Sequence, residues 1–289
     1  MRLLRAATLL SGDADASARR YQEFFGYRLV ESGSISFELA AGWVTPAMFG
    51  RRYHVLAPAS GVPVFLRFVE GNIPPDYQPL RSYGWGAIEL CVQDVQAVHA
   101  LMKDSPFTII GPPKALDGAP SIWPMQVQGP DGEIVFLTEI RADEPTARLP
   151  RAACPVDSLF IAVLACQDIA ATRAWFAANL GLTGAPDFDL AYTTLSRAFA
   201  LPATHKHRIA VLGHEGDAFL QLDQYPEEAI PRPTTPDELP PGVAMVSFLL
   251  PAAESPHAPT DPSIIYAGRH SLVIRTPEGA LVELIAQAG

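Results

Sequence analysis

The stretch DADASARRYQEFFGYRLV, residues 13–30, decides the fold, because DIAATRAWFAANLGLTG, residues 168–184, repeats its pattern. At an offset of 155 residues the two stretches align without a gap. The matched pairs are Asp13 with Asp168, Ser17 with Thr172, Tyr21 with Phe176, Phe25 with Leu180, and Gly26 with Gly181. An internal repeat of this length indicates a duplicated structural unit.

Each copy predicts a strand, a helix and a second strand. The aspartate stands just before the helical pattern, where an N-cap side chain accepts hydrogen bonds from the first free amides. Apolar residues recur at three- and four-residue spacing along the predicted helix. The glycine follows the last helical residue, where a left-handed C-cap is favoured. We therefore interpret these aspartates and glycines as structural residues.

Further segments correspond in the two halves. Residues 84–102 and 242–251 each begin with an apolar strand, and both halves close with a turn and a strand, GPDGEIVFLTEI at 129–140 and TPEGALVELIAQ at 276–287. Each half therefore contains two smaller βαβββ-like units.

These openings and P-[DE]-G closings resemble the vicinal oxygen chelate superfamily, which includes glyoxalase I, bleomycin-resistance proteins and extradiol dioxygenases. The resemblance implies an α+β fold with two tandem domains, each built from paired βαβββ units that form a cupped mixed β-sheet. The expected boundaries are 1–141 for the first domain, 142–155 for a proline-containing linker, and 156–289 for the second domain.

Composition and charge restrict the function classes. A chain of 289 residues with 48% hydrophobic and 18% charged residues is typical of a soluble globular protein. No apolar run is long enough to span a membrane, and no signal peptide is recognisable. The net charge of −10 argues against nucleic acid and against anionic membranes as partners. Three cysteines form no disulfide framework. We expect a cytoplasmic protein, either a monomer or a homodimer, whose partner is a small molecule.

The resemblance also implies where a metal would bind. The superfamily takes His, Gln or Glu ligands from one position on each of four strands. These positions hold Ala6, Arg67, Ala87 and Phe136 in the first half, and Ile161, Gln221, Met245 and Glu283 in the second half. Zinc and iron sites need about three good ligands, usually with imidazole. The sequence therefore predicts no metal and no cofactor. A loop pair, His205 and His207, is expected to be solvent-exposed.

Strand alternation predicts which side chains share a cup. In the first cup, Arg67 and Glu89 are expected to form a buried pair, which is either structural or an anchor for a carboxylate ligand. In the second cup, Gln221 and Glu283 would face Ile161, Met245 and Ser247. This polar pair is either a site for a ligand or a remnant bonded internally. Aromatic residues that could line either entrance are Trp43, Tyr53, Trp123, Tyr192 and Tyr225.

Two function classes remain. The first is a metal-independent binding protein of the bleomycin-resistance kind, which holds an apolar or aromatic molecule against Arg67, Glu89 and Phe136 or against Ile161, Met245 and Ser247. The second is an enzyme, namely a metal-independent lyase or isomerase with Glu283 as acid–base group and Gln221 as its partner. A ring-cleaving dioxygenase is disfavoured, because extradiol enzymes carry His, His and Glu where this chain has Ile161, Met245 and Glu283.

Overall fold

The computed structural model describes residues 3–143, 148–250 and 261–286. It consists of two mixed β-sheets and a few short helices, which confirms the α+β class. The helical segments are α1 (Ala14–Phe25), α2 (Phe37–Gly42), the 3-10 turn η1 (Pro46–Met48), α3 (Val95–Met102), α4 (Ile169–Leu180) and α5 (Thr193–Ala198).

The seven-stranded sheet has the order β15-β16-β14-β1-β4-β3-β2. Its strands are β15 (Ser271–Arg275), β16 (Leu281–Ala286), β14 (Gly242–Leu250), β1 (Leu4–Ser11), β4 (Phe65–Glu70), β3 (Arg52–Ala57) and β2 (Arg28–Ser34). Strands β1 and β14 pair antiparallel at its centre, and each has a parallel neighbour on its other side.

The nine-stranded sheet has the order β10-β12-β13-β9-β5-β8-β7-β6, with β11 paired to β12. Its strands are β10 (Thr183–Gly184), β12 (Lys206–His214), β13 (Asp217–Gln224), β9 (Val156–Cys166), β5 (Gly84–Val92), β8 (Ile134–Ile140), β7 (Ile122–Gln128), β6 (Thr108–Gly111) and β11 (Phe188–Ala191). At its centre the long strand β9 pairs antiparallel with β5.

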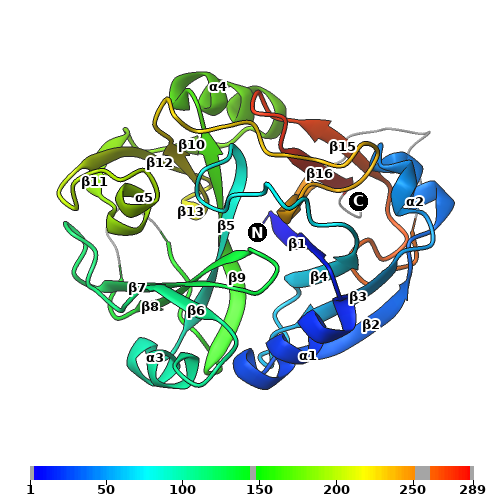
Figure 1. Cartoon of the computed structure of the whole chain (residues 1–289), viewed down its shortest axis with the longest axis horizontal. Helices are drawn as coiled ribbons and strands as arrows, with labels where there is room; N and C mark the ends of the chain where they lie inside the picture. The colour runs from blue at the N-terminus through cyan, green and yellow to red at the C-terminus, as the bar shows by residue number, and fades with distance from the viewer. Residues whose placement is uncertain (1–2, 144–147, 251–260, 287–289) are drawn as a thin grey trace.

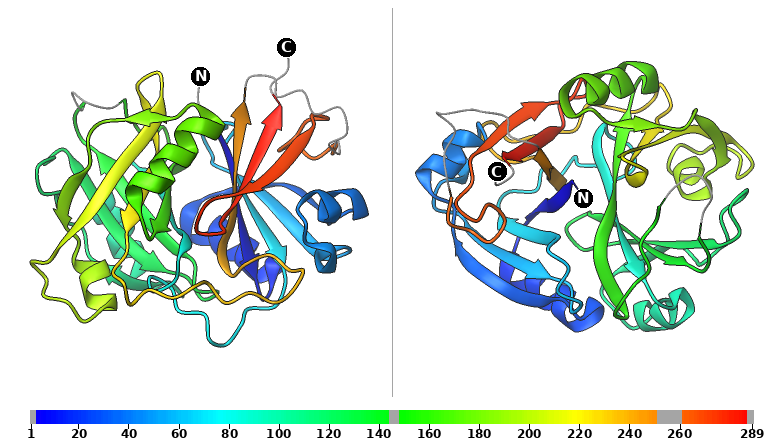
Figure 2. Two further views of the ribbon diagram at one scale, coloured as in Figure 1. Left: turned by 90° about the horizontal axis from the view of Figure 1, so that it is seen from above. Right: turned by 180° about the vertical axis from the view of Figure 1, so that it is seen from behind.

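The pairing of units differs from the expectation that each half of the chain forms its own cup. The first unit shares a sheet with the fourth, and the second shares a sheet with the third. Figure 2 shows this directly, because the blue and the red ribbons lie in one sheet. The pairing is set at the centres of the sheets, where β1 pairs with β14 and β5 pairs with β9. Residues 71–83 and 225–241 then carry the chain from one sheet to the other.

The division of the chain at residues 142–155 stays a prediction. Residues 144–147 of that linker lie outside the described residues, as do residues 287–289 of the second expected domain.

The repeated helices form as the sequence predicts. The Asp13 side chain accepts a hydrogen bond from the Ala16 amide, and Asp168 accepts from the amides of Ala170 and Ala171. Both helices end at a glycine in the left-handed region, with φ of 67° at Gly26 and 65° at Gly181. A residue with a Cβ atom would be strained at either C-cap.

The two sheets pack against each other through their convex faces, so that their concave faces point outward. The contact is apolar and includes Trp85 of β5, Phe219 of β13 and Phe248 of β14, with ring centroids of Phe219 and Phe248 5.9 Å apart. Figure 1 shows α5 lying within the curve of one sheet and α2 beside the other. We call the two concave faces the seven-stranded cup and the nine-stranded cup.

Equivalent hydrogen bonds tie the two sheets together at the repeated helices. Asp131, in the closing turn of the second unit, accepts hydrogen bonds from Ser11, Ser17 and Arg20 of the first unit. Glu278, in the closing turn of the fourth unit, accepts one from Thr172 of the third unit. Since Ser17 matches Thr172 in the repeat, duplication has conserved the position of this contact within the chain.

We expect Asp131→Ala to lower the free energy of unfolding by about 1.5–3 kcal/mol, the usual range for hydrogen bonds to a charged group. Glu278→Ala serves as the matched variant and should cost less, because Glu278 accepts a single side-chain bond. Urea unfolding followed by circular dichroism measures both values. Equal losses in the two variants would contradict this explanation.

Candidate functional site

The eight positions predicted from the resemblance fall into two groups that differ from the expected ones. The seven-stranded cup contains Ala6, Arg67, Met245 and Glu283, and the nine-stranded cup contains Ala87, Phe136, Ile161 and Gln221. Each cup thus takes two positions from each half of the chain. The expected pairs of Arg67 with Glu89 and of Gln221 with Glu283 are wrong, because their members lie in different sheets.

The strand register nevertheless confirms the alignment of the two halves. Thr8 lies beside Arg67 in the parallel pair β1–β4, and Val163 lies beside Gln221 in the parallel pair β9–β13. Thr8 and Val163 match at the same offset of 155 residues. Arg67 and Gln221 are therefore equivalent, although their alignment requires a shift of one residue.

Glu283 is the centre of a buried polar cluster in the seven-stranded cup. Its Oε1 atom accepts hydrogen bonds from Trp43 Nε1 at 3.0 Å and from the Tyr266 hydroxyl at 2.7 Å. Its Oε2 atom accepts from Ser247 Oγ at 2.5 Å. The Glu283 side chain is 0% exposed, so these donors replace the hydration that burial removes. Ser247 therefore lies close to Glu283, as the sequence predicted.

Arg67 completes this cluster as its cation. Its guanidinium lies 3.6 Å from Glu283 Oε2 and donates to Thr8 Oγ1 and to the Tyr266 hydroxyl. It also lies over the Trp43 ring, 4.4 Å from the ring centroid. Burial lowers the pKa of Arg67, but the neighbouring Tyr266 and Glu283 raise it by more, so the net pKa is raised. The guanidinium is therefore charged at neutral pH.

The side chains of this cluster fill the seven-stranded cup. Trp43, at the end of α2, and Tyr266 are both fully buried. Apolar residues from α2, η1 and the segment before β15 pack over the same face, among them Leu39, Met48 and Ile265. The arginine and the carboxylate are thus satisfied by the protein's own groups.

The nine-stranded cup presents a different arrangement, with two buried carboxyls and no arginine bonded to them. Glu89 of β5 accepts a hydrogen bond from Thr138 of β8, and Asp223 of β13 accepts one from Gln221 at 2.7 Å. Glu89 is 6% exposed and Asp223 is 1% exposed. Among the described residues neither carboxyl takes part in an ion pair.

The pKa values of both carboxyls are raised, so both ionise less readily than exposed carboxyls do. Burial, helped by the neighbouring charge of Asp223 and opposed by the hydrogen bond from Thr138, raises the pKa of Glu89 to about 7. Burial likewise raises the pKa of Asp223 to about 7, opposed by the hydrogen bond from Gln221. A carboxyl whose pKa lies near neutrality can donate or accept a proton under physiological conditions.

Tyr192 faces these carboxyls from the residue before α5. It is 7% exposed, and its ring packs edge-on against Phe136, with centroids 6.1 Å apart. Burial raises the pKa of Tyr192 well above its usual value, and the charges of Asp223 and Glu89 contribute to the rise. The phenol is therefore neutral. Its hydroxyl forms no hydrogen bond with any residue that the structure describes.

The remaining walls of the nine-stranded cup are apolar. Its floor is formed by alternate residues of β9, and its sides come mainly from aromatic residues: Ile161, Val163, Ala165, Phe136, Tyr225, Tyr83 and Phe199. This composition, apolar walls with a few convergent polar groups, is typical of a small-molecule site.

Sequence reasoning missed several members of the two clusters. Asp223 follows Gln221 by two residues on the same face of β13, so strand alternation from Gln221 would have found it. Thr8 likewise follows Ala6 by two residues on the same face of β1. Tyr266 could not be inferred, because it lies in an irregular segment between strands.

Of the two histidines expected to be exposed, His205 is exposed, whereas His207 lies in β12 and is buried. His207 is 3% exposed, and its Nε2 atom lies 2.9 Å from Ser196 Oγ. Burial, and to a lesser extent His205, lower the pKa of His207 to about 4, so its imidazole is neutral.

The residues at the superfamily's ligand positions do not fit a metal ion in either cup. In the seven-stranded cup the Arg67 guanidinium already lies beside Glu283, and Ala6 offers no donor atom. In the nine-stranded cup Gln221 is the single position with a donor side chain. No group of three or more His, Cys, Asp or Glu side chains is close enough to hold a metal ion within the described ranges.

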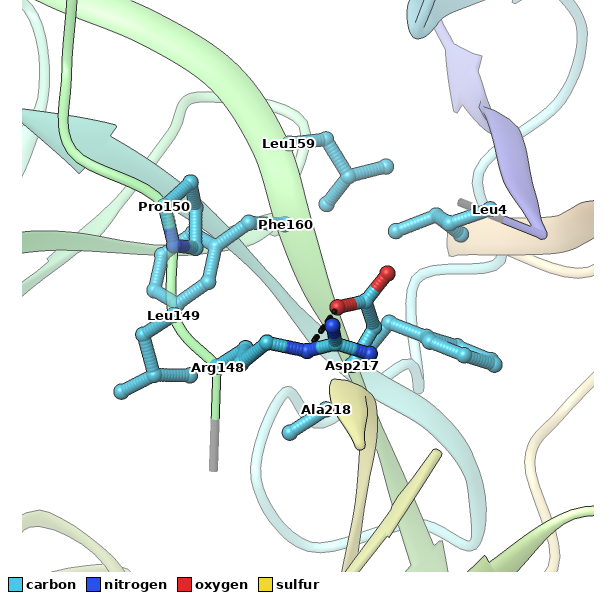
Figure 3. Close-up of a pocket in the computed structure, with 9 residues that line it drawn as sticks. Leu4, Arg148, Leu149, Pro150, Leu159, Phe160, Asp217 and Ala218 are labelled. Carbon is cyan, nitrogen blue, oxygen red and sulfur yellow. Dashed lines mark ion pairs between the residues drawn. The ribbon is translucent and has the colours of Figure 1, made fainter. Parts of the chain in front are cut away.

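A separate cavity of about 200 Å³ lies outside both cups, where the linker passes the start of β13. Figure 3 shows Arg148 of the linker paired with Asp217, with a distance of 3.0 Å between Nε and Oδ1. The cavity is smaller than the roughly 300–1,000 Å³ of most ligand sites. None of the predicted site residues lines it.

Comparison with solved structures identifies the architecture. The chain superimposes on glyoxalase I from Zea mays with a TM-score of 0.65, covering 99% of this chain and 92% of that chain at 17% sequence identity. The chain has the glyoxalase I fold. A proposed dioxygenase from Bacillus subtilis matches with a TM-score of 0.62, 100% and 86% coverage, and 12% identity. This likeness establishes the glyoxalase I fold and leaves the chemistry to the residues of the cups.

Searches with protein-family models and among curated proteins found no match. None of the described helices is long and apolar enough to cross a membrane.

Proposed function

We propose that the protein binds a small apolar or aromatic molecule in the nine-stranded cup without a metal ion. The observation that carries this proposal is the incomplete hydrogen bonding of Glu89 and Asp223. Each carboxyl accepts one side-chain hydrogen bond, although a carboxylate offers about four acceptor positions. No oxygen of either carboxyl is both fully buried and without a partner, so a bound molecule can reach the free acceptor positions and supply the remaining donors.

The seven-stranded cup is the weaker candidate by the same criterion. Glu283 accepts three hydrogen bonds and lies beside a cation, and all of these groups belong to the protein. A ligand would have to displace Trp43 or Tyr266 from full burial. Arg67, Ser247, Met245 and Glu283 are therefore assigned in this proposal to the support of the fold.

The walls of the nine-stranded cup favour an apolar ligand. Phe136 and Tyr192 present two ring surfaces at right angles, with an interplanar angle of 88°. Ile161 supplies an aliphatic surface beside them. Aromatic contacts with this geometry favour flat, apolar groups.

We expect Phe136→Leu to weaken the binding of aromatic compounds by about fivefold, because one aromatic contact is worth about 1 kcal/mol. Phe65→Leu, on the concave face of the other sheet, is the matched control and should leave the affinity unchanged. Methyl-labelled NMR during titration with aromatic compounds locates the site. Shifts at the Ile161 methyl groups support the proposal, whereas shifts confined to Ile265 and Ile285 would place the ligand in the seven-stranded cup.

An enzymatic function of the same cup is the alternative, and a specific observation favours it. The pKa values of about 7 for Glu89 and Asp223 suit a general acid and base at neutral pH. A metal-independent isomerase or lyase would use such a pair, whereas a ring-cleaving dioxygenase finds no iron ligands here. Turnover that falls in Glu89→Gln while ligand affinity is retained would favour catalysis over binding alone.

A further inference from the structure

A serine, a histidine and an aspartate form a chain of hydrogen bonds at the edge of the seven-stranded sheet. The Oγ atom of Ser32, on β2, lies 2.8 Å from His54 Nδ1, and His54 Nε2 lies 2.7 Å from Asp15 Oδ1. His54 belongs to β3, and Asp15 belongs to the first turn of α1, which packs against β3 (Figure 1). Three separate elements therefore contribute one side chain each. The binding function proposed above uses none of them.

The hydrogen bonds determine which nitrogen of His54 carries the proton. An ionised carboxylate only accepts hydrogen bonds, so His54 Nε2 must donate to Asp15. In the neutral imidazole Nδ1 then has the free lone pair and accepts from the Ser32 hydroxyl. The hydroxyl is thus bonded to the atom that would take its proton, which is the arrangement that activates a serine as a nucleophile.

Further contacts keep Asp15 ionised and in place. Its Oδ2 atom accepts a hydrogen bond from Arg52 Nη1 at 2.9 Å, and Arg52 Nε donates to Glu70 at 3.0 Å. The hydrogen bond with His54, and to a lesser extent the charge of Arg52, lower the pKa of Asp15. The N-terminus of α1 also favours a negative charge in its first turn. The His54 side chain is only 13% exposed, so its ring is packed in the orientation that joins the other two residues.

Ser32 is open to an approaching substrate. It is exposed, and β2 is the last strand of the sheet within the described ranges. The Ile35 amide donates to the Arg51 carbonyl at 2.9 Å, and amides along an antiparallel edge strand point alternately toward the neighbouring strand and away from it. The Ser32 amide, three residues earlier, therefore points outward. There it can donate to the oxygen of a carbonyl group that the Ser32 hydroxyl attacks.

We propose that Ser32, His54 and Asp15 form an esterase site, in which Ser32 takes the acyl group of an aryl ester and passes it to water. Ser32 Oγ bonds to the acyl carbon while its proton moves to His54 Nδ1. The bond between the acyl carbon and the aryl oxygen breaks, and the leaving phenol takes that proton. A water molecule then attacks the acyl carbon and gives a proton to His54 Nδ1. The acyl group leaves as a carboxylic acid, and the proton returns to Ser32.

The arrangement restricts the substrate to esters with a good leaving group. A single outward amide is available to the negative oxygen of the intermediate, whereas efficient serine enzymes use at least two donors. Aryl esters compensate for this, because a phenolate leaves more readily than an alkoxide. Asp15 contacts neither the substrate nor the reacting atoms and is a positioning residue for His54.

A second contact between a serine and a histidine in the same chain lacks the third member. Ser196 Oγ lies 2.9 Å from His207 Nε2, but no carboxylate is bonded to His207 among the described residues. Both residues are buried, and the pKa of about 4 makes His207 a weak base. Ser196 therefore serves as an internal control that is expected not to react.

The first experiment measures which serines of the full chain react with diisopropyl fluorophosphate. In this reaction the serine oxygen bonds to phosphorus, fluoride leaves, and the histidine takes the proton. Peptide mass spectrometry locates the label. Ser32 is expected to react faster than Ser34, which is exposed on the same face of β2, and Ser196 is expected to stay unlabelled. The release of p-nitrophenolate from p-nitrophenyl acetate measures turnover by the same protein.

Variants test the role of each member. His54→Gln should lower the labelling rate of Ser32 and the turnover of the ester by roughly a hundredfold, the lower end of the usual effect of a general base. Ser32→Ala should remove the turnover, and Ser34→Ala should leave it unchanged. Circular dichroism confirms that each variant is folded.

Asp15→Asn distinguishes positioning from a structural role. Arg52 would bind the amide oxygen and leave the NH2 group to face His54, so the ring proton should move from Nε2 to Nδ1 and the turnover should fall. Nitrogen NMR of the His54 ring reports this change of tautomer. A purely structural role of Asp15 would leave the tautomer as it is.

Three outcomes would overturn the proposal. The first is a label on Ser32 that forms no faster than the label on Ser34, a comparison that needs only the unmodified protein. The second is labelling that is equally fast in His54→Gln. The third is labelling of Ser32 without hydrolysis of p-nitrophenyl acetate, because water would then not release the acyl group. None of these results bears on binding in the nine-stranded cup.

Discussion

Arg67→Met is expected to lower the free energy of unfolding by about 3–5 kcal/mol, the usual cost of breaking a buried ion pair from one side. The variant keeps most of the apolar stem of the side chain and removes its charged guanidinium. Glu283 would then lie at 0% exposure with no cation beside it. The Thr8 hydroxyl and the Trp43 ring would also lose their shared partner.

Urea unfolding at pH 7 measures this loss of stability. Two further variants show whether the buried ion pair causes it. Arg67→Met combined with Glu283→Gln should recover part of the stability, because the uncompensated charge is removed. Arg52→Met provides the exposed control: its guanidinium lies 2.9 Å from Glu70 but is 58% exposed, so a loss below about 1 kcal/mol is expected. A loss as small as this in Arg67→Met would mean that the buried pair contributes little to the fold.

Glu89→Gln is expected to stabilise the protein at pH 8 by about 3 kcal/mol and to have little effect at pH 4. The pKa of Glu89 is about 7 in the folded protein against 4.5 in the unfolded chain. The unfolded chain therefore releases this proton at lower pH, and stability falls as pH rises from 4.5 through 7. Each unit of pKa difference corresponds to about 1.4 kcal/mol, and glutamine avoids the loss because it never ionises.

The free energy of unfolding of wild type and variant, measured from pH 4 to 8, tests this expectation. Glu139→Gln on the same strand pair is a control of opposite sign. Hydrogen bonds from Arg141 lower the pKa of Glu139, so its ionised form stabilises the fold and glutamine should be destabilising at pH 8. If Glu89→Gln destabilises the protein equally at both ends of the range, burial does not raise this pKa.

Much of the fold could be predicted because its signals are local. Asp13 and Asp168 cap their helices, Gly26 and Gly181 end them, and these features depend on a few neighbouring residues. The face of each strand could also be predicted, since alternation requires only the order of the residues. Arg67, Glu89, Gln221 and Glu283 all point into a cup, as expected.

The partners of those four residues could not be predicted, because they depend on which units share a sheet. Either pairing of units buries the same apolar strands, so hydrophobic pattern does not distinguish them. The choice is made where β1 pairs with β14 and β5 pairs with β9, which are contacts between segments far apart in the sequence, and its effect on the site is large. Arg67 meets Glu283 rather than Glu89, and Gln221 meets Asp223 rather than Glu283.

The seven-stranded sheet, which joins strands from both ends of the chain, also determines the order in which the protein can fold during synthesis. All strands of the nine-stranded sheet have left the ribosome once residue 224 is exposed. Its central contact, β5 with β9, joins residues 64 to 81 positions apart. The contact of β1 with β14 instead waits until some 240 residues have been translated. Until then the convex face of β1 is exposed and apolar, which makes the nascent chain vulnerable to aggregation at its N-terminal unit.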